Sequence, residues 1–198
     1  MNNSFINSIE YIMKPDQISS NHTSAIYTIG HSTRSIDEFL NLLKNFNIQL
    51  LADIRNYPGS KRFPQFNKEQ MEIYLPENGI DYIHFKDLGG RRKPLINSHN
   101  TAWRNSAFRG YADYMETEPF KKAVESLETH AYQKRTAIMC SEAVWWSCHR
   151  SLVSDYLKHK GWKVWHIMDI NKATEHPYTQ PAKIINNQLT YQEADLFQ

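Results

Sequence analysis

The chain has 198 residues, carries a net charge of +2, and is 40% hydrophobic and 13% aromatic, which excludes an intrinsically disordered protein. It is long enough to bury one hydrophobic core without disulfides, and no apolar run approaches the roughly 18 residues that cross a bilayer. Because the chain begins without the pattern of a secretory signal peptide, we expect a cytoplasmic protein with no membrane partner and two reduced cysteines.

Strand-like and helix-like patterns alternate along most of the chain. Residues 1–24 are polar and are predicted to form an N-terminal extension, and residues 25–198 are predicted to form a single α/β domain. Strands are predicted at residues 25–30, 49–54, 80–85, 136–140 and 163–168. Helices are predicted at 36–46, from the cap Asn67 to a stop at Pro76 and Gly79, from 111 with a restart at Pro119, and from 152 to 161.

This order predicts a mainly parallel five-stranded sheet with helices on both faces, a Rossmann-like three-layer α/β fold, because parallel neighbours need crossover connections. A small hairpin is predicted over residues 182–191, around Asn186-Asn187. In such a sheet, ligands bind at the carboxyl ends of the strands. Polar clusters follow the predicted strands at this edge, so we expect the functional site there.

The motif Cys148-His149-Arg150 is predicted to begin a helix, where free backbone N–H groups favour an anion. Asp53 and Glu142 are candidate general acid and base groups, and Cys148 or Cys140 is a candidate nucleophile near His149. The candidate substrate-binding residues are His31, Ser32, Arg55, Ser60, Gly89, Gly90, Arg109, Tyr111 and Arg150. An alternative role for Arg150 is an ion pair with Asp53 or Glu142 that locks the loops.

A basic connection of about 18 residues leads from Leu88 to Phe108, longer than compact domains usually tolerate without a purpose. Its basic side chains, together with those at its ends, would attract phosphate if they lay over a cleft: Lys86, Arg91, Arg92, Lys93, Arg104 and Arg109. We therefore predict a lid over the site. The alternative is a solvated basic loop.

A soft metal site is an alternative use of the thiols and imidazoles. Cys140, Cys148, His149, His31 and His166 include ligand types suited to zinc or iron. The chain has no C-x-x-C pair and no pair of histidines at helical metal-ligand spacing. We therefore assign no metal ligand and require no cofactor, although zinc or iron would suit these residue types.

Several motifs, in order from about residue 26 to residue 191, resemble those of the bacterial and archaeal family catalogued as domain of unknown function 488. The motifs are the run at 28–32, Asp53-Ile54-Arg55 with Pro58 and Ser60, Leu88-Gly89-Gly90, the run at 108–112, the run at 139–142, and Cys148-His149-Arg150 with His166-Ile167. Position 141 is Ser where the family pattern has Ala. The resemblance supports the location of the site and implies no particular reaction.

The leading hypothesis from the sequence is an enzyme that hydrolyses a phosphate-bearing substrate, either a nucleotide or a nucleic acid. Arg55 and Arg150 would hold the anion, and Asp53 or Glu142 would manage the proton. One alternative is a module that binds a metal or senses oxidation through its thiols. The other is a nucleic-acid accessory protein with no chemistry of its own. The sequence leaves the oligomeric state open.

Overall fold

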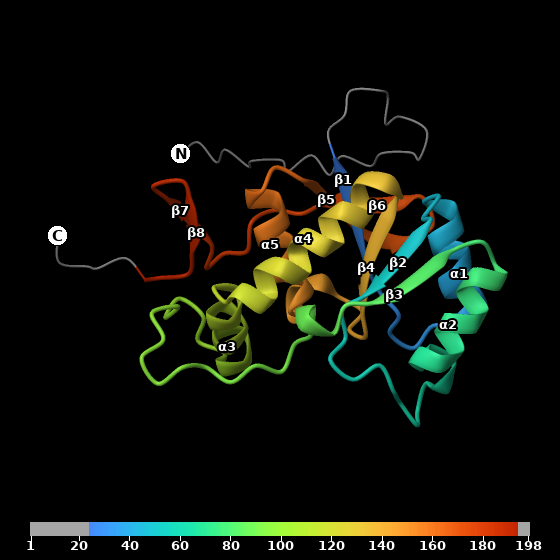
Figure 1. The fold of residues 1–198 in the computed structure, drawn as a ribbon, viewed down its shortest axis with the longest axis horizontal. Coiled ribbons are helices and arrows are strands. Elements are labelled where there is room, and N and C mark those ends of the chain that lie inside the picture. The colour runs from blue at the N-terminus through green and yellow to red at the C-terminus, as the bar shows by residue number, and fades with distance from the viewer. Residues whose placement is uncertain (1–23, 194–198) are drawn as a thin grey trace, which may run out of the picture.

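The computed structural model describes residues 24–193 (Figure 1). Its main sheet has the strand order β3-β2-β4-β1-β5-β6. The strands are β1 (Ala25–Gly30), β2 (Leu50–Asp53), β3 (Asp81–His84), β4 (Thr136–Cys140), β5 (Lys163–Asp169) and β6 (Lys172–Glu175). All neighbouring pairs are parallel except β5 with β6. The predicted mainly parallel sheet is therefore confirmed.

Helices cover both faces of this sheet. They are α1 (Ile36–Asn45), α2 (Lys68–Glu77), α3 (Ser106–Met115), α4 (Glu118–Gln133) and α5 (Arg150–His159). Alternate residues of β1 separate two cores: Ile26 packs with α3, α4 and α5, whereas Tyr27 and Ile29 pack with α1 and α2. This arrangement is the predicted three-layer α/β fold. No helix within residues 24–193 has the length and apolar character needed to cross a membrane.

The sequence prediction was one strand short, because it did not include β6. This strand pairs with β5 at the sheet edge, and of its four residues only Ala173 is buried. A short, polar edge strand carries little of the alternating pattern by which strands are recognised. The turn before it is made by Asn171, which has a φ of 54°.

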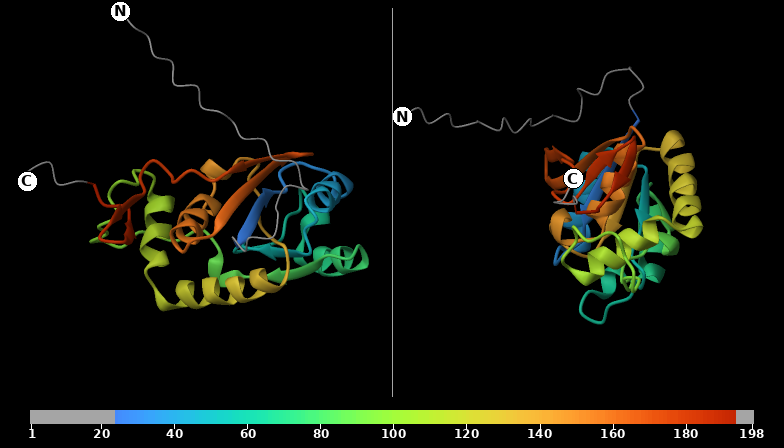
Figure 2. Two further views of the ribbon diagram at one scale, coloured as in Figure 1. Left: turned by 90° about the horizontal axis from the view of Figure 1, so that it is seen from above. Right: turned by 90° about the vertical axis from the view of Figure 1, so that its left-hand side faces the viewer.

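The C-terminal hairpin is confirmed as β7 (Lys183–Ile185) and β8 (Gln188–Thr190), a separate two-stranded sheet in which β8 contacts α5 (Figure 2). Its turn residues Asn186 and Asn187 both have positive φ, the conformation of a two-residue hairpin turn. Helix α2 differs from the prediction in its end, since Pro76 lies within its last turn and does not stop it. The predicted N-terminal extension lies outside the described residues except for Ser24.

Candidate active site

A pocket of about 600 Å³ lies at the carboxyl ends of β1, β2 and β4. Each of these strands sends a loop into its wall, as expected for the ligand edge of a parallel sheet. The predicted site residues that line the pocket are His31, Ser32, Arg55, Ser60, Gly90, Tyr111, Cys140, Glu142, Cys148 and His149. Asp53, Gly89, Arg109 and Arg150 are not among its lining residues. The structure thus brings most of the predicted residues together around one space.

Two thiols and an imidazole form a compact cluster in this wall. Nδ1 of His149 lies 3.9 Å from Sγ of Cys140 and 3.7 Å from Sγ of Cys148, and both cysteines are buried. Sγ of Cys140 also lies 3.0 Å from Oε2 of Glu142. The other ring nitrogen of His149, Nε2, lies 3.0 Å from the carbonyl oxygen of Ile54. Because a carbonyl only accepts, Nε2 carries a hydrogen and Nδ1 is directed at the sulfurs.

The three groups shift one another's pKa values. A hydrogen bond from the Cys148 thiol, together with His149, holds the pKa of Cys140 well below that of a free thiol. Burial and the neighbouring Cys140 raise the pKa of Cys148. Burial opposes a charge on His149, but the hydrogen bond and charge of Cys140 more than compensate and raise the pKa of the imidazole. Cys140 therefore favours the thiolate, the form that both attacks electrophiles and ligates metals.

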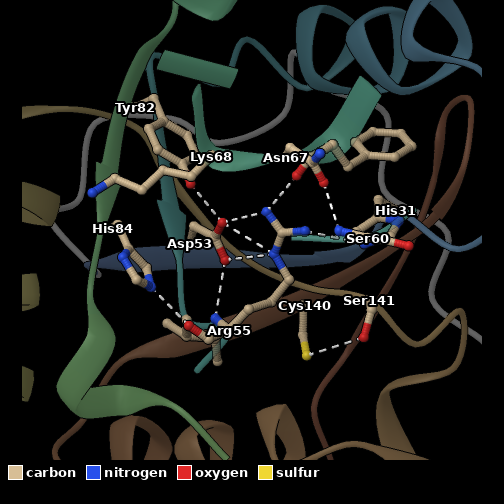
Figure 3. Close-up of polar contacts among 12 residues, drawn as sticks. His31, Asp53, Arg55, Ser60, Asn67, Lys68, Tyr82, His84, Cys140 and Ser141 are labelled. Atoms are coloured by element: carbon tan, nitrogen blue, oxygen red, sulfur yellow. Dashed lines mark hydrogen bonds and ion pairs between the residues drawn. The ribbon is translucent and has the colours of Figure 1, made fainter. Parts of the chain in front are cut away.

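Asp53 is the last residue of β2, and Figure 3 shows its carboxylate beside the guanidinium of Arg55 and the ring of Tyr82. Its carboxylate is fully buried and accepts hydrogen bonds from Nε of Arg55 at 2.9 Å, from Nη2 of Arg55 at 2.5 Å, and from the hydroxyl of Tyr82 at 2.6 Å. The sequence suggested Asp53 as a general acid or base. In the structure, both oxygens of its carboxylate already accept hydrogen bonds from Arg55 or Tyr82. We infer that Asp53 fixes the direction of the Arg55 guanidinium.

Tyr82 was not predicted as part of the site. It lies on β3, beside β2 in the sheet, and burial together with the charge of Asp53 raises its pKa, so the hydroxyl stays a donor. Its only sequence signal is its position two residues before the end of a strand, which does not distinguish it from an ordinary strand tyrosine.

His31 forms the wall beside Arg55. Its ring stacks on Phe66 with centroids 4.3 Å apart, and Nδ1 lies 2.9 Å from the carbonyl oxygen of Ser32, to which it donates. Nε2 lies 3.5 Å from Nη1 of Arg55. Burial and the adjacent guanidinium lower the pKa of His31 to about 4. His31 is therefore neutral at neutral pH and offers an unprotonated Nε2 to Arg55.

Arg150 holds the loop that follows β4. Its side chain is 1% exposed, and Nη2 donates to the carbonyl oxygen of Glu142 at 2.8 Å. The predicted alternative, in which Arg150 locks the loops, resembles this geometry, but the acceptor is a backbone carbonyl and not a carboxylate. A Cβ on Gly30 would lie 1.8 Å from that same carbonyl oxygen. The close approach of the β1 and β4 loops thus requires glycine at position 30.

The basic connection is fastened to the protein surface over much of its length. Asp113 of α3 accepts hydrogen bonds from the Leu95 amide, the Ser98 hydroxyl and the Asn100 side chain.

The prediction that this connection forms a lid depended on its basic side chains lying over the cleft. Of the six basic residues named for it, Arg91 lines the pocket. The Arg92 guanidinium stacks on Tyr114 at 3.6 Å, and Nε of Arg109 donates to the carbonyl oxygen of Trp103 at 2.9 Å.

Gly90 lies directly against the ring of His149, where a side chain would not fit. A Cβ at position 90 would lie 2.8 Å from Nδ1 of His149. We expect Gly90→Ala to displace the ring from the sulfurs and to lower the free energy of unfolding in urea by about 1–3 kcal/mol, the usual cost of overpacking. Gly59→Ala is the matched control, since Gly59 also lines the pocket and a Cβ there would meet nothing within 4 Å. Equal unfolding free energies and unchanged His149 ring chemical shifts in both variants would contradict this account.

Comparison with known proteins identifies the family of the chain. No curated protein and no solved structure matches the chain. A family model described as "Domain of unknown function DUF488" matches residues 35–157, which is more than half of the chain. The matched region includes Arg55, Cys140, Glu142, Cys148 and His149. The chain therefore belongs to the DUF488 family, as the motifs in its sequence predicted.

Proposed function

We propose that the protein is a hydrolase that cleaves a phosphate ester of a small molecule about the size of a nucleotide. The observation that carries the proposal is that two kinds of group line one pocket. Arg55 and Arg91 bring guanidinium groups to it, and Cys140, Glu142 and His149 bring groups that can transfer protons. Guanidinium and proton-transfer groups around one space suit an anionic substrate that is to be cleaved.

The size of the pocket favours a small molecule over a nucleic acid. Its volume of about 600 Å³ lies within the range of small-molecule sites. A nucleic acid would need a basic track beyond the pocket. Arg92 and Arg109 do not supply one, because they are bound to Tyr114 and to the Trp103 carbonyl.

The two arginines have different roles in this proposal. Arg55 is 6% exposed and is held by Asp53, and its Nη2 also donates to the Phe66 carbonyl at 2.8 Å, so Nη1 is the nitrogen that presents an N–H group in a fixed direction to a phosphate oxygen. Arg91 is exposed, and its guanidinium lies 5.8 Å from the centre of the Tyr57 ring. An exposed guanidinium such as that of Arg91 would add affinity for a phosphate more than orientation.

Glu142 is the group best placed to accept the proton of the attacking water. It lines the pocket and is exposed, unlike Asp53, whose oxygens accept from Arg55 and Tyr82. In the proposed reaction, a bond forms between the water oxygen and phosphorus while the ester P–O bond breaks. Glu142 takes one proton from the water, and the same proton then passes to the leaving alkoxide.

The experiment that tests this function is phosphorus NMR on the purified protein with nucleoside phosphates, sugar phosphates, short DNA and short RNA. We expect release of inorganic phosphate from at least one small phosphate ester. Turnover of DNA or RNA alone would overturn the assignment of a small substrate, and no turnover of any phosphate ester would overturn the proposed hydrolase.

Two pairs of variants separate chemistry from binding. Glu142→Gln should lower kcat by about 100-fold or more, the range of general base catalysis, while exposed Glu77→Gln at the end of α2 leaves it unchanged. Arg91→Gln should raise KM with little change in kcat, because it removes a binding charge. Arg104→Gln is its control, since Arg104 belongs to the same basic connection and does not line the pocket. Equal kinetics for the two members of either pair would contradict the assigned role.

A further inference from the structure

The geometry of the thiol–imidazole cluster points to a metal site in the pocket wall. Sγ of Cys140, Sγ of Cys148 and one ring nitrogen of His149 all lie within 4.8 Å of one another. We propose that these three residues bind one Zn²⁺ ion. The catalytic role of this zinc ion rests on the proposed hydrolase, whereas the site itself is inferred from the geometry of the three residues.

The distances suit tetrahedral zinc. With Zn–S bonds of about 2.3 Å and Zn–N bonds of about 2.0–2.1 Å, a tetrahedral ion places its sulfur and nitrogen ligands about 3.6 Å apart. Nδ1 of His149 lies 3.7 Å from Sγ of Cys148 and 3.9 Å from Sγ of Cys140. Both sulfur–nitrogen distances therefore lie within a few tenths of an ångström of the tetrahedral value. Two thiolates with one imidazole form a donor set that favours zinc over magnesium or calcium.

The surroundings of the ligands also fit a metal site. Histidines that bind zinc through one ring nitrogen almost always donate a hydrogen bond from the other, and here Nε2 of His149 donates to the Ile54 carbonyl at 3.0 Å. The backbone amide of Arg150, at the start of α5, donates to Sγ of Cys148 at 3.5 Å. This amide bond and the positive end of the helix favour a thiolate at position 148 when a cation is bound.

Three protein ligands leave a fourth position for water, which is the pattern of catalytic zinc sites and not of structural ones. Because the cluster lines the pocket, this position would face the substrate space. Oε2 of Glu142 lies 3.0 Å from Sγ of Cys140, beside the ligands, where it could accept a proton from that water. The zinc ion would lower the pKa of the water to about 7 and so supply the nucleophile of the proposed hydrolysis.

The test is the metal content of the full-length protein after growth in zinc-supplemented medium, measured by inductively coupled plasma mass spectrometry. We expect one zinc per chain. After removal of zinc with a chelator, added Co²⁺ should restore one metal per chain and give the near-ultraviolet absorption of cobalt–thiolate bonds. Neither readout depends on activity.

Cys140→Ser and Cys148→Ser should each lose more zinc affinity than the roughly 10–100-fold that removal of an outer-shell partner costs. His99→Asn is the control, because His99 is exposed and lies outside the cluster. Far-ultraviolet circular dichroism of each variant confirms its folding. Should a serine variant fail to fold, the cobalt–thiolate spectrum of the wild-type protein still decides, since it reports sulfur ligation directly.

Absence of bound metal from the wild-type protein, or unchanged zinc affinity in both cysteine variants, would overturn the site. Failure of the metal site can be distinguished from failure of the proposed function. Hydrolysis by a wild-type protein that is purified without zinc and binds no added Co²⁺ would reject the metal site and keep the hydrolase. Stoichiometric zinc with no turnover of any phosphate ester would keep the metal site and reject the hydrolase.

Discussion

Replacing Asp53 with alanine is expected to lower the free energy of unfolding by about 3–5 kcal/mol, the cost of breaking a buried ion pair by removing one partner. The change would leave the Arg55 guanidinium, which is 6% exposed, without its counter-ion. It would also leave the Tyr82 hydroxyl without its acceptor. Urea unfolding followed by circular dichroism measures the effect.

Two further variants separate this explanation from a general loss of packing. Asp87→Ala should change the unfolding free energy by no more than about 0.5 kcal/mol, because Asp87 is exposed and makes no side-chain hydrogen bond within the described residues. Adding Arg55→Met to Asp53→Ala should recover much of the lost stability, since no buried charge then lacks a partner. A double variant less stable than Asp53→Ala would show that the buried arginine is not the source of the loss.

The second large effect is expected at Asp155, a fully buried residue of α5. Its carboxylate accepts hydrogen bonds from the amide of Thr179 at 2.8 Å, from the Thr179 hydroxyl at 2.5 Å and from the Tyr191 hydroxyl at 3.0 Å. Nε2 of His176 lies 2.9 Å from the same carboxylate. Each donor left unpaired costs about 1–3 kcal/mol, so Asp155→Ala should lower the unfolding free energy by at least about 3 kcal/mol.

The same substitution should loosen the loop after β4. Nδ1 of His176 lies 2.9 Å from Nε2 of His166, and Trp145 stacks on His166 with ring centroids 4.3 Å apart. We therefore expect altered tryptophan fluorescence in Asp155→Ala even at low denaturant concentration. Asp81→Ala is the control, because the Asp81–Lys134 pair is exposed and such pairs contribute less than about 1 kcal/mol. Equal effects of the two substitutions would contradict the assigned role of Asp155.

The fold could be predicted because its signals are local. Strand-like runs alternate with helical spacing, and Ser35 with Glu38 forms the predicted capping box, with hydrogen bonds of 3.2 and 2.7 Å. Such alternation favours a parallel sheet, and a parallel sheet gathers its loops at one edge. The location of the pocket therefore followed from the sequence, whereas the polar edge strand β6 lacked a comparable signal.

The detailed roles of the site residues could not be predicted, because they depend on side-chain directions. Asp53 and Arg55 are two residues apart in the sequence, and nothing in that spacing indicates that the guanidinium turns back onto the carboxylate. The proximity of Cys140 and Cys148 depends on the fold of the loop between them, which Arg150 holds through the Glu142 carbonyl. A sequence spacing of seven intervening residues does not resemble a metal-binding motif, although the folded loop brings the ligands together.

Titration of the nitrogen-15-labelled protein with a nucleoside monophosphate tests whether the pocket at the carboxyl ends of β1, β2 and β4 binds a phosphate-bearing ligand. We expect saturable chemical-shift changes at Ser32, Arg55, Gly90, Arg91 and Ser141, all of which line this pocket. A second pocket, of about 850 Å³, lies between the hairpin and helices α3 and α5, and its lining includes Asn100, Tyr156 and Ile185. Shifts confined to those residues, or no shifts at all, would show that the pocket at the strand ends does not bind the phosphate.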